Sequence, residues 1–103
     1  MGKLQFQNAV FDEGTNQSVR RGVKWDVAEH HDVQIAATQE PDKILATVDI
    51  RTRVIQFTEI RSHDLLQEHD PACRIWDDLY RRMKQVYDDF DEAEIVTLVW
   101  FEI

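Results

Sequence analysis

A cationic segment, SVRRGVKW at residues 18–25, stands out in an otherwise acidic chain. The chain has 20 acidic and 12 basic residues and a formal net charge of −8, yet this segment holds three cations and no acid. A guanidinium forks onto a phosphate or a carboxylate, and an indole stacks on a nucleobase. These residue types predict a ligand-binding rim made of Ser18, Arg20, Arg21, Lys24 and Trp25.

The spacing within this segment determines which side chains can meet. Consecutive residues of a strand point to opposite faces, so Arg20 and Arg21 should diverge. Gly22 permits a tight turn that brings Lys24 and Trp25 back near the same rim. In the alternative interpretation, Arg21 and Lys24 pair with surface acids and Trp25 is a core residue. Composition alone does not separate the two interpretations.

Other residues that carry chemistry lack a productive spacing. His30 and His31 are adjacent and lack the i, i+4 partner of a helical zinc site. The acidic run at residues 88–94 lacks the glycine and the regular ligand spacing of a calcium loop. The sequence has neither a phosphate-binding glycine motif nor a nucleophile elbow. We therefore predict no metal and no cofactor.

The elements that must position the rim are strands first, then helices, then a final strand. Apolar alternation predicts a half-buried strand over residues 4–11, and short β-compatible runs occupy residues 17–21 and 32–38. Residues 44–54 alternate clearly, but the apolar side changes face at residues 55–57, which predicts a bulge or bend there. Residues 94–103 are almost continuously apolar, which indicates a strand buried on both faces.

Two helices are expected before that last strand. Ser62 can cap a helix of about two turns, and Asp70 followed by Pro71 predicts the start of a long helix that runs to residue 90. The apolar side chains of the long helix gather in one sector of about 140°, which should face the sheet. The helix residues expected to pack on Val96, Leu98 and Val99 are Ile75, Leu79, Met83 and Val86. The order of elements predicts a small α+β protein with a curled, mostly antiparallel sheet.

Length and composition restrict the class of protein. A chain of 103 residues with 43% hydrophobic and 31% charged residues predicts one ordinary domain over residues 1–103. No apolar run is long enough for a signal peptide or a membrane helix, so we expect a cytoplasmic protein with no membrane partner. A charge of −8 disfavours duplex DNA as a partner. No pattern in the sequence indicates an oligomeric state.

The order of these segments resembles the ASCH domain of the PUA-like superfamily over nearly the whole chain. The resemblance is carried by EGTNQSVRRGVKW (13–25), ILATVDIRTRVIQFTEI (44–60), LLQEHDPACRIWDDLYRRMKQVYDDF (65–90) and IVTLVWFEI (95–103). In that family a segment similar to GxKxxxxR leads into the cleft, and Gly14, Ser18 and Arg20 correspond to its glycine, small hydroxyl residue and arginine. The resemblance implies a small PUA-like pseudo-barrel with a short helix and one long flanking helix.

The same resemblance implies binding of RNA or of a modified nucleoside. Some members are small amidohydrolases of acetylated cytidine or are reported as ribonucleases, and in the amidohydrolases a lysine lies three residues before the hydroxyl residue. This chain has Thr15 there, so we expect binding of a nucleoside or of single-stranded RNA. The alternative is a hydrolase of a modified nucleoside or RNA that uses Lys24 with Glu68 or Asp70. A plain interaction module is the third hypothesis, and the sequence does not decide whether the chain is an enzyme.

Overall fold

The computed structural model describes residues 2–103, and its six strands form two three-stranded sheets. The smaller sheet has the order β1–β3–β4. Its strands are β1 (Lys3–Phe6), β3 (Val33–Ala37) and β4 (Ala46–Val48), with β1 parallel and β4 antiparallel to β3. The strand predicted over residues 4–11 is therefore shorter than expected.

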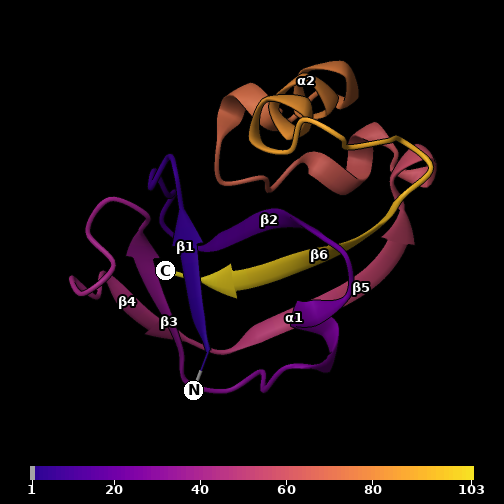
Figure 1. Ribbon diagram of the computed structural model, residues 1–103. Helices are drawn as coiled ribbons and strands as arrows, with labels where there is room; N and C mark the ends of the chain where they lie inside the picture. The colour runs from indigo at the N-terminus through magenta and orange to yellow at the C-terminus, as the bar shows by residue number, and fades with distance from the viewer. Residues whose placement is uncertain (1) are drawn as a thin grey trace.

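The larger sheet is antiparallel and has the last strand at its centre. Strand β6 (Ile95–Glu102) lies between β2 (Thr15–Arg21) and β5 (Ile50–Gln56). Figure 1 shows residues 57–90 above this sheet and the smaller sheet at one end of it. The prediction of an α+β protein with mostly antiparallel strands is confirmed.

Strand β6 is buried on both faces because each face has its own hydrophobic core. Val96 and Leu98 belong to the core under the helical segments, whereas Val99 and Phe101 belong to the core shared with the smaller sheet. All four side chains are at most 2% exposed. The prediction of a doubly buried final strand is confirmed, and the expectation that Val99 packs with the helix is wrong because it faces the opposite core.

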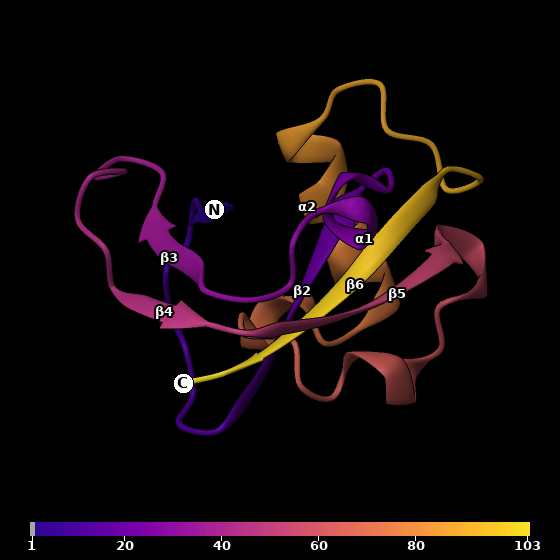
Figure 2. The ribbon, with the colours of Figure 1, turned by 90° about the horizontal axis from the view of Figure 1, so that it is seen from below.

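The bend in the fourth and fifth strands lies earlier than predicted. Val48 ends β4 and Ile50 begins β5, so the chain bends at Asp49, and Figure 2 shows β4 leading into β5. No bulge interrupts the pairing of β5 with β6 from Ile50 to Gln56. Ile50 packs in one core and Ile55 in the other, so the change of apolar face reflects two cores and not a local distortion.

The helices are shorter than the sequence pattern predicted. A four-residue helix, α1 (Lys24–Val27), follows β2, and one-turn 3-10 helices occupy Phe57–Glu59, Ser62–Leu65 and Pro71–Cys73. The main helix, α2, spans Trp76–Val86. Asp70 does cap the turn at Pro71, since its carboxylate accepts a hydrogen bond of 3.0 Å from the Ala72 N–H. Within residues 2–103 no helix is both long and apolar enough to span a bilayer.

The break before α2 changes which of its side chains are buried. Leu79 and Met83 are 3% and 4% exposed, so their predicted packing is confirmed. Ile75 is 62% exposed and Val86 is 37% exposed, so their predicted packing is wrong. Ile75 is extended and precedes the first helical residue, and Val86 is the last residue of α2.

The turn after β2 depends on a glycine with a left-handed backbone. Gly22 has φ 75°, and a Cβ atom added there would meet no atom within 4 Å. Only backbone strain should therefore oppose a side chain. We expect Gly22→Ala to lower the free energy of unfolding by about 1 to 2 kcal/mol. Gly22→Asn should cost less, because asparagine tolerates this region better, and chemical denaturation of both variants checks the expectation.

Candidate functional site

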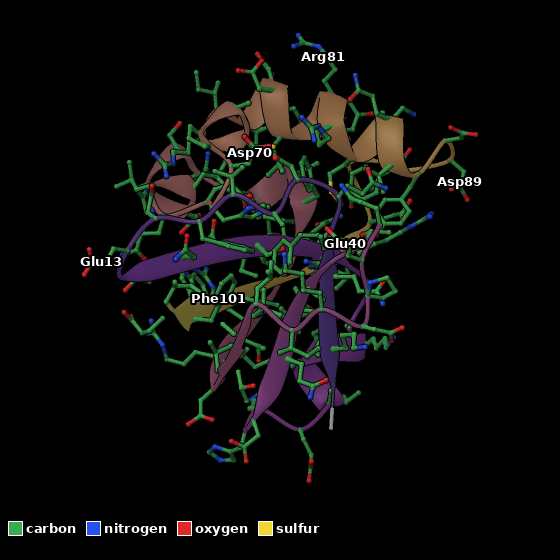
Figure 3. All side chains as sticks on the ribbon, turned by 90° about the vertical axis from the view of Figure 1, so that its left-hand side faces the viewer. Glu13, Glu40, Asp70, Arg81, Asp89 and Phe101 are labelled. Carbon is green, nitrogen blue, oxygen red and sulfur yellow. The ribbon has the colours of Figure 1, made fainter. Side chains whose placement is uncertain are left out.

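A pocket of about 250 Å³ lies at the outer edge of β2. Its walls come from several segments: residues 5–8, residues 18–20, Thr38, residues 68–73, and α2 with Tyr87 after it. Its polar lining includes Asn8, Ser18, Arg20, Glu68, Asp70 and Arg82. In Figure 3 Asp70 lies between the helical layer and β2, where these segments meet.

Backbone pairing brings residues 67–69 against β2. Gln17 accepts a hydrogen bond of 2.8 Å from the His69 N–H and donates one to the Gln67 carbonyl, so this segment forms a short parallel bridge with the strand edge. Ser18 and Arg20 are two residues apart in β2 and therefore share a face. The bridge places Glu68 in the same pocket as these two side chains.

Glu68 is a carboxyl group buried without a full set of partners. The residue is 3% exposed, and its Oε1 atom lies 3.3 Å from His69 Nε2 and 3.4 Å from the Asp70 N–H nitrogen. Its Oε2 atom has no hydrogen-bond partner within the described chain. Burial raises the pKa of Glu68 to about 8, so most of this carboxyl is protonated at pH 7.

The neighbouring histidine indicates where that proton lies. His69 Nδ1 is 2.9 Å from the Val10 carbonyl oxygen, which can only accept, so Nδ1 carries a proton. Burial lowers the pKa of His69 and favours the neutral ring, in which Nε2 is an acceptor. The protonated Oε1 of Glu68 can then donate to Nε2. This arrangement leaves Oε2 as an almost completely buried acceptor without a hydrogen-bond partner among the described residues.

Arg20 is one of two arginines that line the pocket. Its Nε donates to Ser18 Oγ at 2.8 Å, one Nη donates to the Gln5 carbonyl at 2.8 Å, and the guanidinium lies 4.4 Å from the centre of the Phe6 ring. These partners are neutral, and the ion pairs of residues 2–103 include none to Arg20. Burial lowers the pKa of Arg20 to about 10, which leaves it cationic at neutral pH.

Asp70 holds the opposite wall of the pocket together. Its Oδ2 accepts a hydrogen bond of 2.9 Å from Asn8 Nδ2, while Oδ1 caps the turn at residue 72. Burial opposes ionisation, but the hydrogen bonds from Asn8 and Ala72 outweigh it and lower the pKa of Asp70. Asp70 is therefore an ionised structural acceptor, which fits the predicted cap better than a catalytic acid.

The structure separates the residues of the predicted rim. Ser18 and Arg20 line the pocket, as do Glu68 and Asp70, but Arg21, Lys24 and Trp25 do not. Arg21 points to the other face of β2, where hydrogen bonds to Glu94 and Asp89 raise its pKa. The predicted rim of five adjacent residues is therefore wrong as a unit.

Trp25 and Lys24 depart from the binding interpretation in different ways. Trp25 is 8% exposed and belongs to the core under the smaller sheet, so its predicted place in the ligand-binding rim is wrong and the alternative, a core residue, is confirmed. Its ring also leaves no room for a side chain at Gly2, where an added Cβ would lie 2.9 Å from it. Lys24 is exposed, and its Nζ is 5.8 Å from the centre of the Trp25 ring. Lys24 is thus not placed to act with Glu68 or Asp70.

Several residues that line the pocket were not predicted from the sequence, among them Asn8, His69, Arg82 and Tyr87. Asn8 broke the apolar alternation of the first strand, and that defect was the available signal. Tyr87 follows α2 and was assigned to the buried helix face, but it is only partly buried and lines the pocket. His69 gave no signal, because its role depends on the bridge between β2 and residues 67–69.

The polar side chains of the site are arranged for hydrogen bonding and not for metal coordination. Across residues 2–103, no three His, Cys, Asp or Glu side chains gather in the way that a metal site requires. Comparisons with known proteins give no match among family models, curated proteins or solved structures. The chemistry of the pocket therefore rests on its own residues: a buried carboxyl with a free oxygen, an arginine without an acidic partner, and aromatic walls.

Proposed function

We propose that the chain is an ASCH-type domain of the PUA-like superfamily that binds a nucleoside in the pocket at β2. The nucleoside is free or is an unpaired residue of single-stranded RNA. Two of the three positions that the family resemblance singles out, Ser18 and Arg20, line one pocket together with Glu68, whereas Gly14 does not line it. The bend between β4 and β5 and the curled sheets are compatible with a PUA-like pseudo-barrel.

The observation that carries this proposal is the unpaired Oε2 of buried Glu68 in a pocket with Arg20. A buried acceptor without a partner costs free energy, and a ligand N–H would remove that cost. The edge of a nucleobase presents donors next to acceptors, and unstacked bases are read on these edges. Glu68 supplies the acceptor and Arg20 the donor for such an edge.

The other walls and the size of the pocket favour a single base. Of the Phe6 and Tyr87 rings that line it, Phe6 is 3% exposed and packs against the Arg20 guanidinium, so the partly buried Tyr87 ring is the one that offers surface for stacking. Its volume of about 250 Å³ is slightly below the range of about 300–1,000 Å³ that is typical for drug-sized ligands. The net charge of −8 and the pairing of Arg21 with acids disfavour a long contact with a nucleic-acid backbone.

Two adjacent arginines provide a matched test of this proposal. Arg20→Gln should weaken binding of cytidine, or of a short single-stranded RNA, by about 10- to 100-fold, because a specific guanidinium contact to a base is worth about 1–3 kcal/mol. Arg21→Gln makes the same charge change on the other face of β2 and should leave the affinity within about twofold. Isothermal titration calorimetry of both variants measures the difference.

The controls define what would contradict the proposal. Arg20 also donates hydrogen bonds to Ser18 and Gln5, so its replacement could affect folding. Circular dichroism and denaturation of both variants should show that they fold. Absence of saturable binding by the wild-type protein to cytidine, acetylcytidine and single-stranded RNA would reject nucleoside binding. Equal losses of affinity in Arg20→Gln and Arg21→Gln would show that binding depends on the overall charge of the protein and not on the pocket.

Hydrolysis of a modified nucleoside is the second candidate, and the pKa of Glu68 favours it. A carboxyl group with a pKa of about 8 can take and return a proton near neutral pH. In amide hydrolysis Glu68 would accept a proton from the attacking water and give it to the leaving nitrogen, without Lys24. Release of acetate from acetylcytidine that stops in Glu68→Gln would establish this activity, and binding without turnover would exclude it.

A further inference from the structure

The charges that line the pocket do not balance. Arg20 and Arg82 are cationic, and Asp70 is the ionised acid of the pocket lining. Glu68 is mostly neutral at pH 7 because burial raises its pKa. The lining therefore carries one excess positive charge. A neutral nucleoside would leave that charge uncompensated in a partly desolvated pocket, whereas an anionic ligand would compensate it.

Arg82 is the cation best placed to receive an anionic group. Its side chain is 38% exposed at the mouth of the pocket, and its Nη2 atom is 3.7 Å from Asp70 Oδ2. That distance is too long for a hydrogen bond, and Asp70 already accepts from Asn8 and Ala72. The guanidinium thus keeps its forked set of N–H donors, which matches the geometry of phosphate oxygens.

A second hollow adjoins the pocket at the same arginine. Cys73 and Arg82 line both spaces, and the second hollow also borders Asp78 and Gln85 on the outer side of α2. Its volume is about 330 Å³. A ligand whose base fills the pocket therefore has room for a further group beyond the mouth, on the far side of Arg82.

From this geometry we propose that the site selects a nucleotide over the corresponding nucleoside, with Arg82 binding the phosphate at the junction of the two spaces. This inference rests on the proposed function, because the base must first occupy the pocket. Arg82 is then a residue that determines specificity, and Arg20 with Glu68 holds the base. A free mononucleotide and the phosphorylated end of an RNA strand offer the same phosphate chemistry.

Calorimetric titrations with cytidine, cytidine 5′-monophosphate, cytidine 3′-monophosphate and a 5′-phosphorylated RNA trinucleotide test the inference. One of the monophosphates should bind wild-type protein about 10- to 100-fold more tightly than cytidine, as expected for charge-assisted hydrogen bonds. In Arg82→Gln the ratio of monophosphate affinity to cytidine affinity should fall to within about twofold. Arg51→Gln, an equal charge change at an exposed position of β5, should keep the preference.

The possible outcomes distinguish the role of Arg82 from the proposed binding of a nucleoside. Saturable cytidine binding by Arg82→Gln also shows that the variant folds. Equal affinity of wild type for cytidine and both monophosphates, or a preference that survives in Arg82→Gln, would overturn the role of Arg82 and leave nucleoside binding intact. Failure of every ligand to bind would reject nucleoside binding itself. Tighter binding of the trinucleotide than of either monophosphate would identify an RNA end as the source of the phosphate.

Discussion

Replacing Leu79 by Ala should lower the free energy of unfolding by about 2 to 5 kcal/mol. Leu79 is 3% exposed and belongs to the core between α2 and the larger sheet, with Phe57, Phe90 and Leu98 as fully buried neighbours in that cluster. Truncation removes apolar contacts and leaves a cavity that these rigid neighbours cannot fill. Urea denaturation at a fixed pH measures the loss directly.

A control on the same segment makes this test specific. Ile75 precedes α2 and is 62% exposed, so Ile75→Ala should change the free energy of unfolding by no more than about 0.5 kcal/mol. The sequence periodicity treats the two positions alike, and only the structure separates them. A loss below about 0.5 kcal/mol for Leu79→Ala, or similar losses at both positions, would show that α2 does not cover this core.

Replacing Glu68 by Gln should stabilise the protein at alkaline pH. Burial raises the pKa of Glu68 from 4.5 to about 8, so the folded state binds a proton that the unfolded state releases in this range. The contribution of Glu68 to the free energy of unfolding is therefore fully present below about pH 4.5 and is lost as the pH rises towards 8. Above pH 8 this contribution changes little. A glutamine side chain cannot ionise, so the variant lacks this loss. Because one pKa unit corresponds to about 1.4 kcal/mol, the rise from 4.5 to about 8 predicts a difference on the order of 5 kcal/mol at pH 9.

Denaturation curves between pH 4 and pH 9 provide the measurement. The difference between wild type and Glu68→Gln should grow between about pH 4.5 and pH 8 and level off above pH 8, while Glu13→Gln, an equivalent change at an exposed position, should follow the wild-type curve. Parallel curves for wild type and Glu68→Gln would mean that Glu68 is already ionised at neutral pH. The assignment of a neutral Glu68 carboxyl with an unpaired acceptor oxygen would then be wrong.

The elements that follow from local pattern were predictable from the sequence. The continuous apolar run of β6 indicated burial on both faces, and Asp70 followed by Pro71 indicated a capped turn; both are present. The phase of the helix was not predictable, because it depends on a break at residues 74–75. Ile75 is extended at ψ 135°, so α2 starts at Trp76 and the side chains before it do not continue the helical stripe.

The candidate site was predictable only in part, for a related reason. Ser18 and Arg20 share a face of one strand, and this relation is local. The tight cluster of cations around Gly22 suggested that Lys24 and Trp25 join them, but the chain turns the other way and buries the indole. The acidic partner Glu68 comes from a bridge between segments about fifty residues apart in sequence, and such long-range pairing leaves no periodic signal in one chain.

The central position of β6 also constrains the order in which the chain can fold. Both β2 and β5 pair with β6 through residues 15–21 and 50–56, and they have no pairing with each other. During synthesis these two strands therefore remain without their shared neighbour until residues 95–102 have emerged from the ribosome. Contacts of such long sequence separation form slowly and leave unpaired strand edges exposed in the meantime. The nascent chain is thus most vulnerable to aggregation just before its sheet is complete.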